Sequence, residues 1–422
     1  MVAIRPFRGL QFSRSYVKDF SRVLTQPYDK ISADLQKSYY ESSEYNIIRL
    51  EKNKAEIDGN AYKTAHYYLD LWRKAGVLIA SKKPSYYVLE QTFSFEDQTL
   101  TRRALIGMGH LHEYKEGIIY PHEQTLRGPK VDRLELLRAT QINLGQIFML
   151  YDDPAQTVQK ILDKHRSGQP FFSIKDDEGI TQTLFRVDDE DVCGHLTDAM
   201  AEQKLYIADG HHRYETALAY SAESGVPYHM MSFVNIHDPG LRILPTHRLI
   251  NLDLSYSYQN VLDELQKQFS VKRIPVPKDL SEVKGILHNL SENSLLWIEK
   301  NHPTELIQLT LQHSPFLEES IPSLKTLDVY VLHQAILEPI LGITQEDLAN
   351  HTYITYKRDP VGTLSEVVKH KQAMGFLLKP TGVEQVIRVA QDRQTMPQKS
   401  TDFYPKLLTG YVMADVSSMD VL

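Results

Sequence analysis

The sequence contains one cysteine, no long hydrophobic run and no excess of positive charge. Cys193 is the only cysteine among 422 residues, so the chain cannot form an internal disulfide, and we expect a reducing compartment. No apolar run approaches the ~18 residues that a membrane-spanning helix needs, and the segment from Met1 has no apolar core of signal-peptide length. These absences predict a cytoplasmic protein that does not span a membrane.

The formal net charge of -7 argues against a general nucleic-acid coat, which needs many cations to displace phosphate counterions. No helix-turn-helix pattern is recognisable either. Hydrophobic residues at 42% and charged residues at 24% are ordinary for a globular protein. At this length a single core is rarely sufficient, so two or three domains are expected. Turn signals suggest divisions near residues 120 and 250, which gives units 1–120, 121–250 and 251–422.

Helical and strand periodicities alternate along the whole chain, which predicts a mixed α/β fold. An apolar stripe and a following glycine indicate a helix over 60–74, and two strand-like runs, 85–95 and 100–112, are expected to form a hairpin. A further helix is expected to begin at Asp132, with Asp132 as its cap. Additional helices are expected over 211–223, 261–269 and 326–341, and strands over 147–151, 181–187, 205–208, 228–234, 295–298 and 304–311.

The most informative segment is Asp209-Gly210-His211-His212-Arg213, which follows a short apolar strand. The glycine permits a sharp turn, and the free amides and positive dipole at the start of the following helix favour phosphate. Gly210, His211, His212 and Arg213 are therefore candidate phosphate-binding residues. Asp209 could orient a histidine or hold Mg²⁺. A purely structural interpretation is also open, in which Asp209 caps the helix, Gly210 turns the chain and the histidines lie on the surface.

This segment resembles the nucleotide-binding motif of the ParB/sulfiredoxin-like superfamily, and in particular its free L-serine kinase branch, which carries an Asp-Gly-His-His motif. The resemblance covers roughly residues 120 to 250 and implies a ParB/sulfiredoxin-like central core with additional N- and C-terminal α/β units. It further implies a nucleotide, ADP or ATP with Mg²⁺, and a small hydroxyl compound such as free serine as the acceptor. In that branch a glutamate early in the core is the base. Glu123 corresponds to it by order, although no motif around it matches closely.

A second resemblance covers nearly the whole chain and points to a widespread prokaryotic family of unknown function near the ParB-like proteins. It rests on seven segments, which include the Asp-Gly-His-His-Arg-Tyr-Glu-Thr-Ala segment. The others are Phe7-Arg8-Gly9-Leu10, Pro27-Tyr28-Asp29-Lys30-Ile31-Ser32, His122-Glu123-x-Thr125, Pro129-Lys130-x-Asp132-Arg133-Leu134, Leu244-Pro245-Thr246-His247-Arg248 and Met396-Pro397-Gln398-Lys399-Ser400-Thr401.

Three further segments carry side chains suited to chemistry. The loop 121–130 contains Glu123 and the candidate phosphate ligand Lys130, although a solvated polar loop would have the same composition. His247 next to Arg248 could face the same phosphates, or be structural. Lys399-Ser400-Thr401 with Lys406 suits an anion, but a Gly-x-x-x-x-Gly-Lys phosphate loop is absent from the sequence.

Three hypotheses follow. The first is a phosphotransferase acting on a nucleotide and a small-molecule substrate, with Glu123, Asp209 and His211 as catalytic residues and Asp209 as the metal ligand. The second is a non-catalytic nucleotide-binding or switch module of the ParB type. The third is a metal-dependent hydrolase that uses His110 and His112, with His122, Asp209, His211 and His212 as further ligands, although no His-Glu-x-x-His motif exists. The sequence does not indicate an oligomeric state.

Overall fold

The computed structural model describes residues 1–123, 127–165, 169–251, 256–369 and 373–419. Its internal contacts divide the chain into two compact units. Unit 1 comprises Met1–Pro121, Thr125–Arg242 and Pro405–Leu422, and unit 2 comprises His122–Gln124 and Ile243–Tyr404. The expected boundary near residue 120 differs from this division, because strands from both sides of it share one sheet. The chain also returns to unit 1 after residue 404, which local turn signals could not show.

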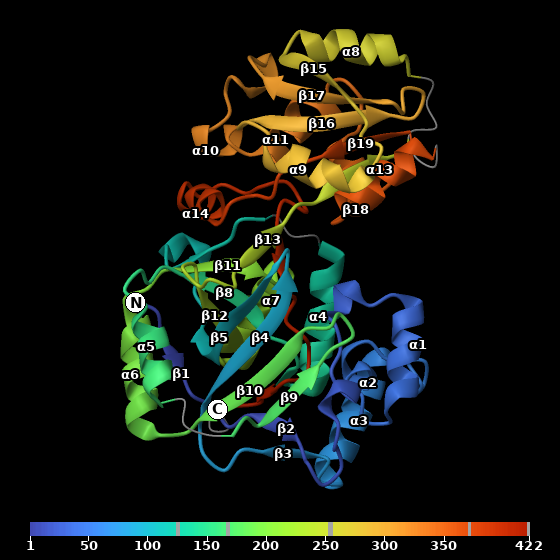
Figure 1. Ribbon diagram of the computed structural model, residues 1–422. Helices are drawn as coiled ribbons and strands as arrows, with labels where there is room; N and C mark the ends of the chain where they lie inside the picture. Colours follow the sequence, from blue (N-terminus) through green and yellow to red (C-terminus); the bar gives the residue numbers. More distant parts are fainter. Residues whose placement is uncertain (124–126, 166–168, 252–255, 370–372, 420–422) are drawn as a thin grey trace. The chain divides into compact units, whose positions relative to one another are not determined.

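Unit 1 contains a mixed sheet that has nine strands among the described residues, in the order β6-β11-β8-β12-β5-β4-β10-β9, with β1 also paired to β5 (Figure 1). The pairs β11·β6 and β12·β8 are parallel, and the other pairs are antiparallel. The strands are β1 Ile4–Arg5, β4 Tyr86–Phe95, β5 Gln98–His110, β6 Ile119–Tyr120, β8 Ile147–Tyr151, β9 Phe172–Lys175, β10 Thr181–Val187, β11 Leu205–Asp209 and β12 Tyr228–Asn235.

The expected hairpin is confirmed in β4 and β5, where Phe95 lies opposite Gln98. Glu96 in the turn has a φ of 52°, the left-handed conformation that tight hairpins use. The expected buried strand is confirmed in β8, whose five residues are all buried, as is usual for a strand in the middle of a sheet. These strands form the platform for the helix that follows β11.

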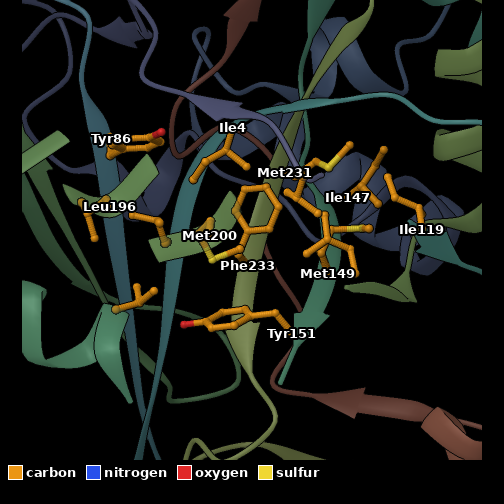
Figure 2. Packing of buried hydrophobic residues seen from close by; sticks show 14 of the residues in the cluster. Ile4, Tyr86, Ile119, Ile147, Met149, Tyr151, Leu196, Met200, Met231 and Phe233 are labelled. Atoms are coloured by element: carbon orange, nitrogen blue, oxygen red, sulfur yellow. The ribbon is translucent and has the colours of Figure 1, made fainter. Parts of the chain in front are cut away.

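The main core of unit 1 joins its sheet to the helices α5 (Thr157–His165) and α6 (Glu190–Ala201), and Tyr214 and Ala217 of a third helix also belong to it. Helices α5 and α6 lie on one side of the sheet in Figure 1. Figure 2 shows how the side chains interlock: Met149 and Phe233 from the sheet face Leu196 and Met200 from α6. Fully burying such side chains contributes about 1.5–3 kcal/mol each, so this cluster accounts for much of the unit's stability.

Two other helices, α4 (Arg127–Thr140) and α7 (His211–Ser224), pack against each other, and α3 (Ala61–Lys74) packs against α4. The prediction of α3 is confirmed, with Asn60 capping its first amides and Leu69 and Trp72 buried. The prediction that Asp132 begins a helix is wrong, because α4 begins at Arg127. Pro129 therefore lies in its first turn, where the missing amide hydrogen is tolerated.

The remaining elements of unit 1 are short. They are β2 Leu10–Phe12, β3 Leu78–Ala80, β7 Ile142–Asn143 and β21 Ala414–Asp415, and the helices α1 Ala33–Ser42 and α2 Ile48–Glu51. Strand β21 pairs with β7, so the returning segment is held by backbone hydrogen bonds.

Unit 2 contains a sheet that has six antiparallel strands among the described residues, in the order β15-β17-β16-β19-β14-β18. The strands are β14 His247–Ile250, β15 Phe269–Pro275, β16 Ser294–Glu299, β17 Glu305–Leu311, β18 Ile354–Lys357 and β19 Met374–Leu377. The helices are α8 Tyr258–Gln266, α9 Val283–His288, α10 Pro322–Lys325, α11 Asp328–Leu332, α12 Gln345–Asn350, α13 Pro360–Val368 and α14 Val383–Gln391. Strands β13 (Arg242–Leu244) and β20 (Asp402–Tyr404) form a separate pair.

Two predicted helices of unit 2 differ from the structure. The expected helix over 261–269 ends earlier, because Phe269 opens β15. The expected single helix over 326–341 is divided, since α11 passes at His333 into a π-helical turn, His333–Leu337. The α/β fold class expected from the sequence is confirmed. Among the described residues, no helix is both long and apolar enough to cross a membrane.

Candidate functional site at the start of helix α7

The turn between β11 and α7 is shaped by one glycine. Residues 205–208 are buried, and the register of β11 against β8 shifts between Ile207 and Asp209, so the strand is irregular at its end. Gly210 has a φ of 95° and is the N-cap of α7 with no side-chain cap hydrogen bond. A Cβ at Gly210 would lie 3.1 Å from Nε and Nη2 of Arg213. The first turn of α7 therefore presents its amides beside a folded-back guanidinium, an arrangement that suits phosphate.

Three cations of unit 1, Lys406, Arg213 and Lys30, act on the carboxylate of Asp209. Lys406 Nζ donates to Asp209 Oδ2 at 2.8 Å. Burial would raise the pKa of Asp209, but Lys406, Arg213 and Lys30 hold it well below its ordinary value. Asp209 is thus ionised at neutral pH and is a weak proton acceptor. The structure supports a positioning role for this carboxylate better than a role in general base catalysis.

Arg213 connects the helix start to the sheet. Its Nη1 donates to the carbonyl oxygen of Gln146, immediately before β8. Behind it lies a cavity of about 50 Å³ lined in part by Glu51, Arg133, Arg213 and His229. Burial raises the pKa of the Glu51 carboxyl. Its Oε1 lies 3.3 Å from Nη1 of Arg133. A cavity of this size holds a few waters and is much smaller than a nucleotide, so a nucleotide would lie outside it.

The other predicted residues of unit 1 are His211, His212 and Lys130. Lys130 Nζ contacts Glu215 Oε2 at 2.7 Å, which joins α4 to α7. His211 and His212 are the first two residues of α7, and His211 is buried, whereas His212 is half-buried. The structure therefore groups all five residues from Asp209 to Arg213 in one turn.

Glu123 and His247 lie in unit 2. Glu123 Oε1 accepts a hydrogen bond from the backbone amide of Lys399 at 2.7 Å. His247 is fully buried, and its Nδ1 accepts from the amide of Leu378 at 3.2 Å. Burial, with a smaller contribution from Arg248, lowers the pKa of His247 to about 3, so this imidazole is neutral at physiological pH and would bring no charge to a phosphate.

The candidate metal ligands do not form a metal site. Within the described ranges, no group of three or more His, Cys, Asp or Glu residues is arranged to hold a metal ion. His110 and His112 do lie together, with ring centroids 4.7 Å apart, but His112 Nδ1 contacts Glu116 Oε2 at 2.8 Å. Asp209 offers a single carboxylate that is already paired with Lys406, which does not fit a Mg²⁺ held by the protein alone.

Several residues at these sites were missed from the sequence as individual candidates, among them Lys30, Glu51 and Arg133. All but Glu51 occur inside the segments that carried the whole-chain resemblance. The segments that belong to unit 1 converge in the structure: Arg133 lies 4.4 Å from the ring of Tyr28, and Lys30 acts on Asp209. Thr125, a member of one segment, lies outside the described residues. The occurrence of Lys30 and Arg133 inside these conspicuous segments was therefore the signal in the sequence that could have identified them as site residues.

The family model for a protein of unknown function, DUF1015, matches residues 4–330, which is well over half of the chain. The chain belongs to the DUF1015 family. A search of curated proteins found no match to this DUF1015 protein. The family assignment therefore brings no established activity with it.

Solved structures that resemble this DUF1015 protein do so at low identity. A free serine kinase in complex with AMP matches with a TM-score of 0.36 and 13% identity, over 73% of this chain and 92% of that one. A conserved hypothetical protein from Pyrococcus furiosus matches with a TM-score of 0.35 and 14% identity, over 76% and 97%. SbnI with a C-terminal truncation from Staphylococcus aureus matches with a TM-score of 0.36 and 12% identity, over 71% and 84%.

Proposed function

We propose that this DUF1015 protein binds a nucleotide, ADP or ATP, by its phosphates at the start of α7 and transfers a phosphate to a small hydroxyl compound such as free serine. One observation supports this most strongly. Arg213, Lys406 and Lys30 come from segments far apart in the sequence, and all three act near one helix start that no side chain caps. Helix-start amides and a guanidinium together match the charge and geometry of a phosphate.

Each side chain has a distinct task in this proposal. Arg213 and the first-turn amides hold the phosphates, and Asp209 keeps Lys406 beside them. Mg²⁺ binds together with the nucleotide, because this ion is usually coordinated by phosphate oxygens and only one or two protein ligands. Phosphoryl transfer depends mainly on positioning and on charge neutralisation, which such a cluster supplies. His211 and His212 remain predicted phosphate ligands, as does Lys130.

The chemical step requires a base. A phosphorus–oxygen bond of the nucleotide breaks, a new one forms to the acceptor oxygen, and the acceptor's hydroxyl proton passes to a carboxylate. The assignment of Glu123 as that base stays a prediction. Its Oε1 accepts from the Lys399 amide, which fixes the orientation of the carboxylate, and a base of this kind contributes about 10²–10⁴ in rate.

The test separates binding from chemistry. We expect Arg213→Ala to weaken nucleotide binding about ten- to a hundredfold in isothermal titration calorimetry, because a charge-assisted contact is lost. We expect Glu123→Gln to bind nucleotide as the wild type does while turnover falls by about 10²–10⁴, followed by phosphorus NMR with free serine and other small hydroxyl compounds. Arg138→Ala is the matched control, since Arg138 pairs with Glu135 and Glu223 on the exposed surface.

Two outcomes would change the proposal. Full turnover in Glu123→Gln would remove Glu123 from the mechanism. Tight nucleotide binding without consumption of nucleotide by any acceptor would instead support the non-catalytic nucleotide-binding module.

A further inference from the structure

Three segments that are far apart in the sequence meet inside unit 2. The amide of Met396 donates to the carbonyl oxygen of His122 at 2.7 Å, and the amide of Lys399 donates to Glu123 Oε1 at 2.7 Å. Arg248 Nη2 donates to the carbonyl oxygen of Lys399 at 3.1 Å. Arg248 thus belongs to a cluster of unit 2 that also holds Glu123, the predicted base, while Arg248 itself has no task in the proposed reaction.

Strand register places the guanidinium of Arg248 and the phenol of Tyr356 on one face of the sheet. Arg248 on β14 lies directly opposite Tyr356 on β18, and its guanidinium carbon is 5.3 Å from the centre of that ring. His247 precedes Arg248 and therefore points to the other face. Arg248 is only 1% exposed and Tyr356 is half-buried, so the guanidinium lies in the interior of unit 2.

The buried polar atoms of this pair lack partners within the described part of the chain. Arg248 donates through Nη1 to the carbonyl oxygen of Thr246 and through Nη2 to that of Lys399, but neither its Nε nor the hydroxyl of Tyr356 has a hydrogen-bond partner. Both ring nitrogens of His333, which interacts electrostatically with Arg248, also lack one. Buried donors are nearly always paired in folded proteins, so several unpaired donors in one place indicate a site for a ligand.

Two further features of the backbone and charge point the same way. His333 opens the π-helical turn, and such turns occur frequently at functional sites. Lys399 has a φ of 57°, a strained conformation for a residue with a side chain. The two hydrogen bonds of Arg248 go to neutral carbonyl groups, and the carboxylate of Glu123 interacts with the guanidinium electrostatically. An anion placed at Nε would add a hydrogen-bonded partner for the positive charge.

We propose that unit 2 contains an oxyanion-binding site in which Arg248 Nε and the Tyr356 hydroxyl donate to one carboxylate or phosphate group of a small molecule. A guanidinium N–H and a phenol hydroxyl that lie on one face of the sheet can donate to two oxygens of the same carboxylate or phosphate. The site goes beyond the proposed nucleotide site, because neither Arg248 nor Tyr356 has a task in the proposed phosphate transfer.

The experiment uses the full chain carrying Arg213→Ala, so that anion binding in unit 1 is weakened and the unit 2 site is measured by itself. The protein is titrated calorimetrically with inorganic phosphate and, separately, with acetate. We expect at least one of the two to bind, and the one that binds more tightly identifies the group the site accepts. Adding Tyr356→Phe should weaken that binding about ten- to a hundredfold, because a hydrogen bond to an anion is lost.

The controls distinguish a ligand site from a structural one. Tyr353→Phe, three positions away, should leave the affinity unchanged. The unfolding free energy of Tyr356→Phe should be equal to or above that of the parent, since its hydroxyl has no protein partner among the described residues. Arg248→Lys, which keeps the charge but removes Nε, should weaken binding as well. The proposal is overturned if neither anion binds to the Arg213→Ala protein, or if Tyr356→Phe binds the anion as tightly as its parent.

Discussion

The side chain of Asp209 illustrates how a single ion pair can decide the role of a motif residue. From the sequence it could cap a helix, hold a metal or take a proton. In the structure its Oδ2 contacts Lys406 Nζ at 2.8 Å, and further cations lie nearby. The pair could not be predicted, because 197 positions separate its members and no local pattern connects them. Arg213, in contrast, was predicted correctly to lie at the helix start, because sequence spacing alone places it there.

The low pKa of Asp209 has a consequence for stability. Since its pKa in the folded protein is depressed, the carboxylate contributes stability above its unfolded pKa of about 3.9, and that contribution is lost as the pH falls below this value. We expect Asp209→Asn to be less stable than the wild type by a constant amount above about pH 5, and the difference to shrink below about pH 4. Urea unfolding across this range measures it.

Asp58→Asn is the control for that experiment. Asp58 pairs with Lys63 on the open surface, where both side chains are more than 60% exposed, so its removal should change stability little at any pH. A difference between wild type and Asp209→Asn that grows toward low pH would contradict the assignment.

At the scale of elements, the strand–turn–helix β11–Gly210–α7 is the part of the fold that sequence reasoning described best. A short apolar strand, a glycine and an amphipathic helix each have a local signature, and all three are present where they were expected. Two features require a glycine at position 210. Its φ of 95° is unfavourable for a residue with a side chain, and a Cβ there would lie very close to the side chain of Arg213.

Replacing Gly210 tests the turn directly. We expect Gly210→Ala to lose about 1–2 kcal/mol of unfolding free energy from the left-handed conformation and, in addition, to weaken nucleotide binding, because the methyl group displaces Arg213. Gly225→Ala, at the other end of α7, has a similar φ of 73° but no atom within 4 Å of the added carbon. It should lose comparable stability in urea unfolding while keeping its nucleotide affinity. Equal affinities in the two variants would show that Arg213 does not act through this turn.

Other elements were predicted less well for identifiable reasons. The sequence places the start of α4 five residues too late, because Pro129 falls in the segment 121–130 that is expected to be a loop, whereas it occupies the first helical turn. The segment 326–341 has continuous helical periodicity, but the structure changes to a π-helical turn at His333. Periodicity does not distinguish the two kinds of turn, and burial of His333 is a tertiary effect. The most informative local irregularity of unit 2 was therefore invisible in the sequence.

At the scale of the whole molecule, the division into two units predicts that a ligand will stabilise mainly the unit to which it binds. A ligand that binds one folded unit stabilises that unit by mass action, by about 2.7 kcal/mol at a hundredfold excess over its Kd. The chain has two tryptophans, and each unit holds one of them, Trp72 in unit 1 and Trp297 in unit 2. Both are buried and so report on the unfolding of their own unit.

Nucleotide should therefore raise the unfolding temperature reported by Trp72 by roughly 5–10 °C at a hundredfold excess over Kd, with a smaller effect on Trp297. Fluorescence-detected melting of Trp297→Phe and Trp72→Phe proteins separates the two signals. At the same nucleotide concentration, Arg213→Ala should reduce the shift at Trp72 to about half or less. A shift confined to Trp297 would place nucleotide binding in unit 2 and contradict the proposed site.

The return of residues 405–422 to unit 1 also bears on how the protein is made. A ribosome adds about 5–20 residues per second, so roughly 10–40 seconds pass between synthesis of Asp209 and of Lys406, 197 positions later. During that interval unit 2 is synthesised while unit 1 still lacks β21 and the ammonium group beside Asp209. The proposed phosphate site thus becomes complete only after the intervening unit has been translated, and a nascent chain interrupted within unit 2 would lack it.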